Sequence, residues 1–167
     1  PDLAAFIASC LEIPTLHCYA DPLAGLTANI LDPGQQFAWH FDTNDFAVTA
    51  MIDEADDGGL FEYVPMTRTP DDESFEKIQQ VLDGDRTKVK TLDLRAGDLQ
   101  IFRGRHSLHR VTRVPASSKP RHAAIFAYTA EPGVIGRVER TRQLFGRVLA
   151  AHEEAENLRV RSDSLID

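Results

Sequence analysis

The sequence contains little of what several protein classes require. Its 167 residues include only two cysteines, Cys10 and Cys18, which are too few for a disulfide framework and lack CxxC spacing. No apolar run approaches the roughly 18 residues that a membrane-spanning helix needs. The 18 basic residues are outnumbered by 26 acidic ones, and the net charge of -8 offers no basic excess for phosphates or anionic lipids. These absences predict a cytoplasmic protein that binds neither nucleic acid nor membranes.

The N-terminus also lacks familiar features. The chain begins with Pro1 rather than Met, and neither a basic region nor a signal-type apolar segment follows. We therefore expect an N-terminal part of the protein to precede Pro1. The residues present, 43% of them apolar, suffice for one domain with a hydrophobic core and are short for two. We expect a single domain over residues 1–167.

Short stretches with strand character dominate the middle of the chain. The run LTANIL (26–31) ends at the turn tripeptide Asp32-Pro33-Gly34, and FAWHFD, FAVTAMID and LFEYV follow. Strands are predicted again at KVKTLDL, DLQIF, LHRVTRV and RHAAIFAYT. About eight such strands at hairpin-like spacing predict a mainly β jelly-roll sandwich or barrel. No strand leads through a glycine-rich turn into a helix, which argues against a dinucleotide-binding layout.

Three segments have helical periodicity. Residues 3–11 predict a short helix that ends before Pro14. Residues 71–84 predict a helical insertion, with capping oxygens at its start and Gly84 as its stop. Residues 138–160 predict a C-terminal helical segment, in which His152 and Glu154 diverge around the helix and lie on a solvated face. The predicted fold is therefore a β core with flanking helices and one helical insertion.

One pair of residues has the spacing of metal ligands. His40 and Asp42 lie two apart in a predicted strand, where both side chains point to one face and Phe41 points to the other. Taken alone, this pair is better explained by a hydrogen bond at a strand edge. A third ligand is available from the segment GRHSLHRV, in which either His106 or His109 can serve but not both, because residues three apart face opposite ways. Two histidines and one carboxylate leave coordination positions open, which suits non-haem Fe(II) and oxygen chemistry.

The combined motifs are more specific than this pair. The stretches NILDPGQQFAWHFD, GGLFEYVP, LRAGDLQIFRGRHSLHRVTRV and RHAAIFAY, in that order, resemble the 2-oxoglutarate and Fe(II)-dependent dioxygenases. Within that superfamily, HFDTNDFAVT, GGLFEYVP and FRGRHSLHRVTRV are similar to the group of free-amino-acid hydroxylases and radical halogenases. The resemblance covers about residues 21–133, the expected core, and implies a double-stranded β-helix, the cupin-like jelly roll.

The resemblance also implies roles for individual residues. His40, Asp42 and His109 match the family's three iron ligands, with His106 as the alternative for the last of them. Arg121 matches the arginine that binds the distal carboxylate of 2-oxoglutarate, a role for which a planar guanidinium is well suited. If LHRVTRV and RHAAIFAY form a hairpin across PASSKP, pairing of Arg113 with Arg121 places Arg121 on the face of His109, about 13 Å along the sheet.

Three further residues are weaker candidates. Asn29 matches the first position of an Asn-x-Tyr pattern that binds 2-oxoglutarate in related enzymes, but Leu31 stands in place of the tyrosine. Asn29 as an ordinary strand amide is nearly as good an interpretation. Thr43 and Asn44 follow the metal motif and either line a substrate pocket or form the turn.

The resemblance implies an activity as well. Halogenases of this group have a small residue in place of Asp42, so the carboxylate here favours hydroxylation of an unactivated C–H bond. The implied substrate is a small molecule, a free amino acid above all, with Fe(II), 2-oxoglutarate and O2 as cofactors and co-substrates, and succinate and CO2 as co-products. Two other functions remain open: a non-catalytic jelly-roll ligand-binding domain, and a zinc-dependent hydrolase with the same three ligands.

Overall fold

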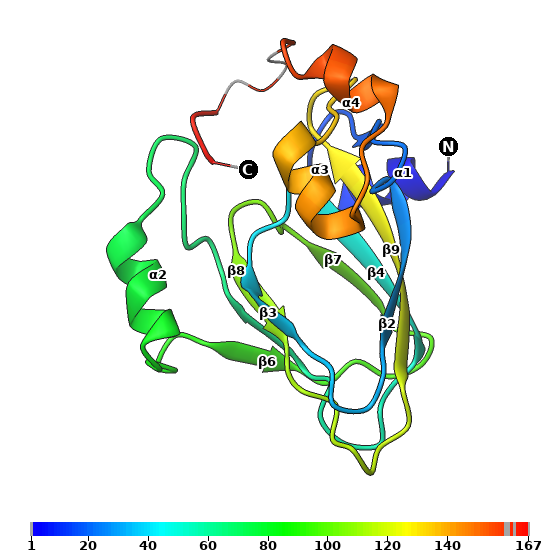
Figure 1. The fold of residues 1–167 in the computed structure, drawn as a ribbon, viewed down its shortest axis with the longest axis vertical. Coiled ribbons are helices and arrows are strands. Elements are labelled where there is room, and N and C mark those ends of the chain that lie inside the picture. The colour runs from blue at the N-terminus through cyan, green and yellow to red at the C-terminus, as the bar shows by residue number, and fades with distance from the viewer. Residues whose placement is uncertain (1, 159–160, 162, 167) are drawn as a thin grey trace.

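Two antiparallel β-sheets form the body of the protein (Figure 1). The computed structural model describes residues 2–158, 161 and 163–166. The larger sheet has the order β1-β9-β4-β7, with β2 also paired to β9. Its strands are β1 (His17–Cys18), β2 (Leu26–Leu31), β4 (Phe46–Asp53), β7 (Leu99–Phe102) and β9 (Arg121–Thr129). The smaller sheet has the order β3-β8-β5-β6, with β3 (Phe37–His40), β5 (Phe61–Val64), β6 (Lys90–Leu92) and β8 (Leu108–Val111).

This arrangement is a jelly roll, and the mainly β fold predicted from the sequence is confirmed. The predicted strand at 26–31 is β2, and every later strand falls within its predicted stretch. The two-residue strand β1 was not predicted, because two residues have no detectable periodicity. Strand β3 ends at His40, two residues earlier than the stretch FAWHFD suggests, so Asp42 lies in the following loop rather than in the strand.

The hairpin expected between LHRVTRV and RHAAIFAY is wrong. Strand β8 pairs with β3 and β5 in the smaller sheet, whereas β9 pairs with β1, β2 and β4 in the larger one. Short sequence separation favours a hairpin, but in a jelly roll consecutive strands also cross from one sheet to the other. His109 and Arg121 therefore belong to different sheets and do not lie along one sheet.

The two sheets enclose one hydrophobic core. Its buried side chains come from both sheets and the adjoining loops, namely Leu31, Ala55, Phe61, Phe102, Val111 and Val114. Residues that alternate with these along the strands face outward, where helices cover part of each sheet. Helix α1 (Asp2–Cys10) buries Ile7 against Phe46, Val48 and Tyr128 of the larger sheet.

Helix α2 (Phe75–Leu82) is the predicted insertion and covers the smaller sheet. Val81 packs with Val64 and Leu108, beside Trp39 and Phe41. Gly84 follows the helix with a φ of 106°, as its expected role as a stop requires, because few other residues tolerate this region. The packing of Trp39 and Phe41 on this outer side leaves His40 directed to the interior.

The C-terminal segment contains two short helices instead of one long helical region. Helix α3 (Val138–Phe145) ends at Gly146, which has a φ of 66°, and α4 (Ala150–Ala155) follows. Residues 159 and 160 of the predicted segment lie outside the described residues. In Figure 1, α3 and α4 lie over the upper end of the jelly roll. None of the described helices has the length and apolar character to span a bilayer.

Candidate metal centre and co-substrate site

Two histidines face each other across neighbouring strands. His40 ends β3 and is the direct partner of His109 on β8, and their ring centroids are 4.1 Å apart. His109 is buried, because the rings of Phe61 and Phe102 pack around it at 5.5 and 4.9 Å. The pairing of antiparallel strands thus brings together two residues that are separated by 69 positions in the sequence (109 minus 40).

Asp42 completes a cluster of three potential ligands. Its Oδ1 atom lies 3.4 Å from Nε2 of His109 and 3.8 Å from Nε2 of His40. One ligand atom from each of the three residues lies within 4.8 Å of the others. This is the only such cluster of histidine, cysteine or acidic residues among the parts of the chain that the structure describes. The predicted pair His40 and Asp42 and the predicted third ligand His109 do meet.

Gly104 makes room for the Asp42 carboxylate. The Asp42 amide donates a hydrogen bond to the carbonyl of Gly104 at 3.1 Å, which holds the loop after β3 against the turn after β7. A Cβ atom at position 104 would lie 1.8 Å from Oδ2 of Asp42. Any side chain here would displace the carboxylate, so Gly104 is required for the cluster. The sequence indicated only a strand boundary at this position.

The histidine rings are oriented for binding through Nε2. Nδ1 of His40 lies 2.7 Å from the carbonyl of Ala38, and Nδ1 of His109 lies 2.9 Å from the carbonyl of Ser107. A carbonyl only accepts, so each Nδ1 carries the hydrogen and each Nε2 of the neutral ring keeps a lone pair. Such bonds on the far nitrogen fix the tautomer and orientation of metal-binding histidines. The donor set and its geometry therefore fit a divalent transition metal.

Electrostatics favour neutral His40 and ionised Asp42. Burial, reinforced by the charge of His109, lowers the pKa of His40 to about 4. Burial opposes ionisation of Asp42, but His109, His40 and Arg140 together lower the pKa of its carboxyl. Burial likewise opposes protonation of His109, yet the adjacent Asp42 carboxylate raises its pKa above the usual value. The Asp42 carboxylate therefore favours the protonated form of His109 when no metal is bound.

Arg121, the first residue of β9, is buried in the interior. It is 2% exposed and pairs in register with Leu31, a residue of the core between the sheets. Its Nη1 donates to Oδ1 of Asn29 at 3.4 Å, while Nε is buried without a hydrogen-bond partner in the described structure. Burial lowers the pKa of its guanidinium to about 10, which still leaves it charged at neutral pH.

Gly59 provides the space for the Arg121 stem. A Cβ atom at position 59 would approach Cδ of Arg121 to 3.0 Å, and the φ of 61° also disfavours other residues. A charged side chain held inside a protein without a carboxylate partner is costly unless it meets an anion. The structure brings together Arg121 and Asn29, both of which the sequence assigned to 2-oxoglutarate binding, in an environment that fits a bound carboxylate.

The other predicted site residues have different surroundings. His106 lies in the turn before β8 and is not part of the metal cluster, in agreement with the choice of His109. Nδ2 of Asn44 donates to the carbonyl of Phe46 at 2.8 Å, so its buried amide is engaged in the turn. Thr43 accepts a hydrogen bond from Tyr19 at 3.3 Å, and its carbonyl accepts one from Arg161. These bonds support the turn-forming interpretation of both residues.

His152 does not lie on a solvated face as expected. It is completely buried, with Nε2 at 3.2 Å from Oδ2 of Asp21 and Nδ1 accepting from the Leu149 amide at 3.1 Å. The expectation considered only the helix, whereas α4 packs against a loop that is 131 residues distant in sequence. Glu154 is exposed, as expected.

Two inward or cavity-facing residues gave no signal in the sequence. Gln100 on β7 is 7% exposed, and neither polar atom of its amide has a hydrogen-bond partner within the described residues. Arg140 on α3 is half-buried and lines a cavity. Neither residue belongs to a motif, and only the fold gives them these positions.

Comparison with known proteins gives a family and a fold. A family model described as Halogenase D matches residues 1–142. The chain is structurally similar to AviO1 from Streptomyces viridochromogenes Tue57, with 20% identity and a TM-score of 0.57 over 80% of this chain and 58% of AviO1. It is also similar to a non-haem monooxygenase, in the structure described as a ThoJ–Ni complex, with 16% identity and a TM-score of 0.53.

These comparisons also set the extent of the likeness. The ThoJ match covers 77% of this chain and 50% of ThoJ. The chain therefore spans 58% of the length of AviO1 and half the length of ThoJ. At these identities the likeness concerns the fold. No curated protein sequence matches the chain significantly.

Proposed function

The chain belongs to the halogenase D family, and on this basis we propose that it is the core of a non-haem Fe(II) and 2-oxoglutarate-dependent oxygenase. The observation that carries the proposal is the cluster of His40, Asp42 and His109, whose ligand atoms lie within 4.8 Å of one another. Two Nε2 atoms and one carboxylate oxygen form the set typical of non-haem iron oxygenases. The fold shared with a solved non-haem monooxygenase, described as a nickel complex, supports a metal-dependent oxygenase.

The interior also fits 2-oxoglutarate. Arg121 provides a buried guanidinium that has only the Asn29 amide as a partner in the described structure, and it faces the interior that the metal cluster also faces. A five-carbon dicarboxylate would bind with one end at the metal and with its distal carboxylate at Arg121. Bound iron with this co-substrate would supply the oxidising equivalent, while the protein fixes both ends and limits access of water.

Asp42 distinguishes hydroxylation from halogenation. A carboxylate ligand occupies the position that halide takes when a small residue is present there, and Gly104 leaves the space that this carboxylate needs. We therefore propose that this member of the halogenase D family hydroxylates an unactivated C–H bond. Its substrate would be a small molecule, specifically a free amino acid, with succinate and CO2 as co-products.

The proposal is tested by coupled turnover. The full-length protein, loaded with Fe(II) and supplied with O2, is expected to convert 2-oxoglutarate to succinate in the presence of one member of an amino-acid panel. Mass spectrometry should find that amino acid heavier by one oxygen atom. Failure to couple co-substrate consumption to any amino acid in the panel contradicts the amino-acid assignment, and absence of succinate under all conditions contradicts the oxygenase.

Arg121→Ala tests the co-substrate site without requiring turnover. Loss of a charge-assisted bidentate contact should weaken 2-oxoglutarate binding about tenfold or more, as calorimetry on the Mn(II)-loaded protein without O2 would measure. Arg113→Ala is the matched control, because Arg113 is an exposed arginine of the preceding segment. Equal losses in both variants would contradict the assignment of Arg121.

The same donor set favours a second candidate, zinc hydrolysis, because two histidines and a carboxylate with open positions also suit catalytic zinc. Activity with Zn(II) in the absence of 2-oxoglutarate would support it. A non-catalytic binding domain would instead keep its ligand affinity in Asp42→Ala and form no succinate.

The two cysteines are exposed and unpaired, which supports the cytoplasmic location proposed from composition.

A further inference from the structure

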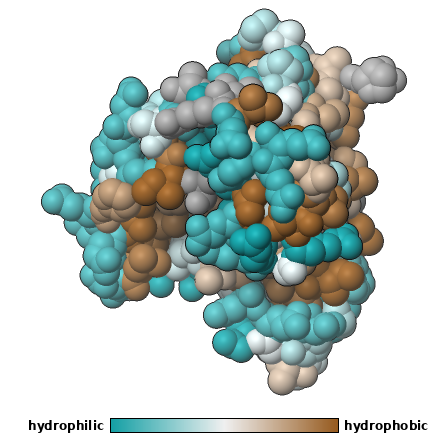
Figure 2. Space-filling model, turned by 45° about the horizontal axis from the view of Figure 1, so that its top comes forward, coloured by the Kyte–Doolittle hydropathy of each residue, from teal (hydrophilic) through white to brown (hydrophobic). Residues whose placement is uncertain are grey.

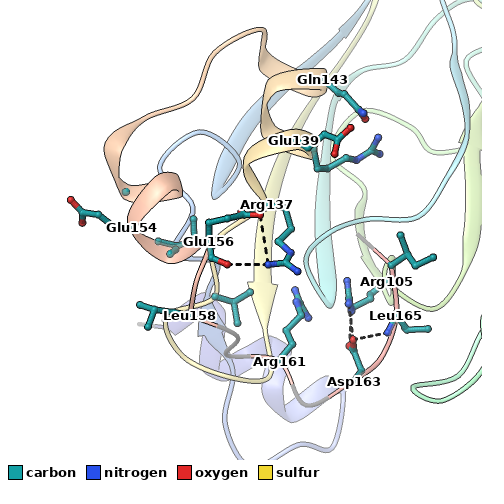
Figure 3. Close-up of a pocket in the computed structure, with 18 residues that line it drawn as sticks. Arg105, Arg137, Glu139, Gln143, Glu154, Glu156, Leu158, Arg161, Asp163 and Leu165 are labelled. Carbon is teal, nitrogen blue, oxygen red and sulfur yellow. Dashed lines mark hydrogen bonds and ion pairs between the residues drawn. The ribbon is translucent and has the colours of Figure 1, made fainter.

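A large cavity lies at the end of the jelly roll that carries the metal cluster. Its volume is about 750 Å³, within the range of small-molecule sites. Its walls come from the segment after β9, from α3 and α4, and from the C-terminal segment, together with Arg105 of the turn after β7 (Figure 3). The space-filling view of this end shows hydrophilic surface between smaller hydrophobic patches (Figure 2).

The cavity adjoins the loops that position Asp42. Arg161 of the cavity wall binds Oδ1 of Asp45 at 2.6 Å and also binds the carbonyl of Thr43. Arg105 directly follows Gly104, whose carbonyl holds the Asp42 amide. Arg161 and Arg105 therefore link the cavity wall to the two loops that position Asp42.

Most of the charge around this cavity is already neutralised. Arg105 forms a bidentate ion pair with Asp163, at 2.7 Å for both contacts. Arg161 is paired with Asp45, and Arg137 lies 3.8 Å from Glu156. Figure 3 draws the Arg137 and Arg105 pairs, with Glu154 pointing away from the cavity.

Arg140 differs from these three arginines. It is half-buried on α3 and lines the cavity, but it makes no hydrogen bond or ion pair with any residue that the structure describes. A half-buried guanidinium that faces a cavity and has no partner in the described structure is suited to bind an anion.

We propose that Arg140 anchors the substrate by binding its carboxylate in this cavity, and so determines both specificity and the distance of the substrate from the metal. The planar fork of Arg140 can bind one carboxylate through two parallel hydrogen bonds. The carboxylate of Glu139, which lines the same cavity and has no partner among the described residues, adds a negative charge that disfavours a phosphate or a dicarboxylate. This inference rests on the proposed function for the reaction, but its site is separate from Arg121.

The test compares free acids with their neutral analogues. The full-length protein is loaded with Zn(II) in place of Fe(II) and saturated with 2-oxoglutarate. Pools of the twenty common amino acids, as free acids and as carboxamides, are then screened by saturation-transfer NMR, and affinities are measured by calorimetry. We expect at least one free acid to bind, with its carboxamide at least tenfold weaker.

Variants of α3 locate the contact. Arg140→Gln should weaken binding of that acid at least tenfold, and Arg140→Lys should do so less, because a lysine keeps the charge without the planar fork. Arg142→Gln, an exposed position on the same helix outside the cavity, should change it less than twofold. All variants should keep the wild-type affinity for 2-oxoglutarate, since Arg140 is not part of that site.

Specific results would overturn the inference. They are no binding of any free acid to the wild-type protein, equal binding of acid and carboxamide, or unchanged binding in Arg140→Gln. The acid–carboxamide comparison needs no variant and remains decisive if Arg140→Gln folds poorly. Failure of the wild-type protein to bind 2-oxoglutarate would instead count against the proposed function, and the screen repeated without 2-oxoglutarate would still test Arg140.

Discussion

Histidine and aspartate side chains pair in two regions of the molecule, the metal cluster and the buried pair of Asp21 and His152. The two regions differ in whether the nitrogen and oxygen atoms of these side chains keep lone pairs that can bind a ligand. At the metal cluster, Asp42 faces the Nε2 atoms of His40 and His109, both Nδ1 atoms being engaged by carbonyls. In the Asp21–His152 pair, both ring nitrogens are engaged, one by Asp21 and one by the Leu149 amide. The first region keeps lone pairs for a ligand, and the second keeps none.

The carboxylates show the same contrast. Oδ1 of Asp21 accepts from the amides of Leu23 and Ala24 at 2.8 Å, and Oδ2 accepts from Gly136 at 3.0 Å as well as from His152. This fully used carboxylate joins the loop after β1 to α4 and to the segment before α3. Burial of a histidine–aspartate pair therefore indicates structure when all its atoms are satisfied, and a binding site when lone pairs remain.

The largest effect is expected for Asp42→Ala. Loss of a metal ligand should weaken Fe(II) binding more than a hundredfold, since even residues that only orient metal ligands contribute about 10- to 100-fold. Binding can be followed by titration with Co(II), whose absorption reports its ligands. His106→Ala is the control, because His106 lies outside the cluster and should leave the affinity unchanged. Equal losses in both variants would mean that the ligand set is wrong.

Asp21→Ala should instead lower the stability of the fold and leave metal affinity unchanged. Removal of this carboxylate leaves three backbone amides and His152 without their acceptor in a buried region, which should lower the free energy of unfolding by about 3 kcal/mol. Urea denaturation would measure this loss. The folded variant should still bind Co(II) with wild-type affinity. A large loss of metal affinity in native Asp21→Ala would remove the distinction between the two regions.

The pH dependence of metal binding should sharpen the comparison further. At about pH 5 to 6.5, His109 is protonated because its pKa is raised, whereas His40, with a pKa lowered to about 4, is neutral and Asp42, whose pKa is also lowered, is ionised. Metal binding then displaces one proton, from His109. The affinity should therefore rise about tenfold for each pH unit in this range. A hundredfold rise per unit, from two displaced protons, would contradict the assignment of His40 as neutral.

Local patterns in the sequence predicted the features that depend on neighbouring residues, namely the positions of the strands and the face to which a strand residue points. Period-2 alternation located β2 and β4 to β9 within their stretches, and the same alternation predicted that His40 faces away from Phe41. Motif order then identified His109 rather than His106. Arg121 and Asn29 lie within hydrogen-bond distance of each other, although the strand pairing assumed for Arg121 was wrong.

Long-range packing determined what the sequence could not show. The assignment of β8 and β9 to different sheets, the break at Gly146 between α3 and α4, and the burial of His152 all depend on contacts between distant segments. Gly104 is a further example, since its importance comes from the Asp42 carboxylate 62 positions earlier (104 minus 42). Arg140 lies near the cluster only because α3 folds over the end of the jelly roll.

Gln100 is a third kind of buried polar side chain. Unlike Asp21, it has no hydrogen-bond partners within the described residues, and unlike Asp42 it does not belong to the metal cluster. Its strand pairs with the middle of β4 at Thr49. Methionine has a similar shape and no amide to desolvate. Gln100→Met should therefore raise the free energy of unfolding by about 1 kcal/mol. The exposed Gln80→Met should change it by less than about 0.5 kcal/mol. If Gln100→Met instead lowers the free energy of unfolding, the amide of Gln100 makes a stabilising hydrogen bond in solution. Its polar atoms would then be available to a ligand, like those of the metal cluster.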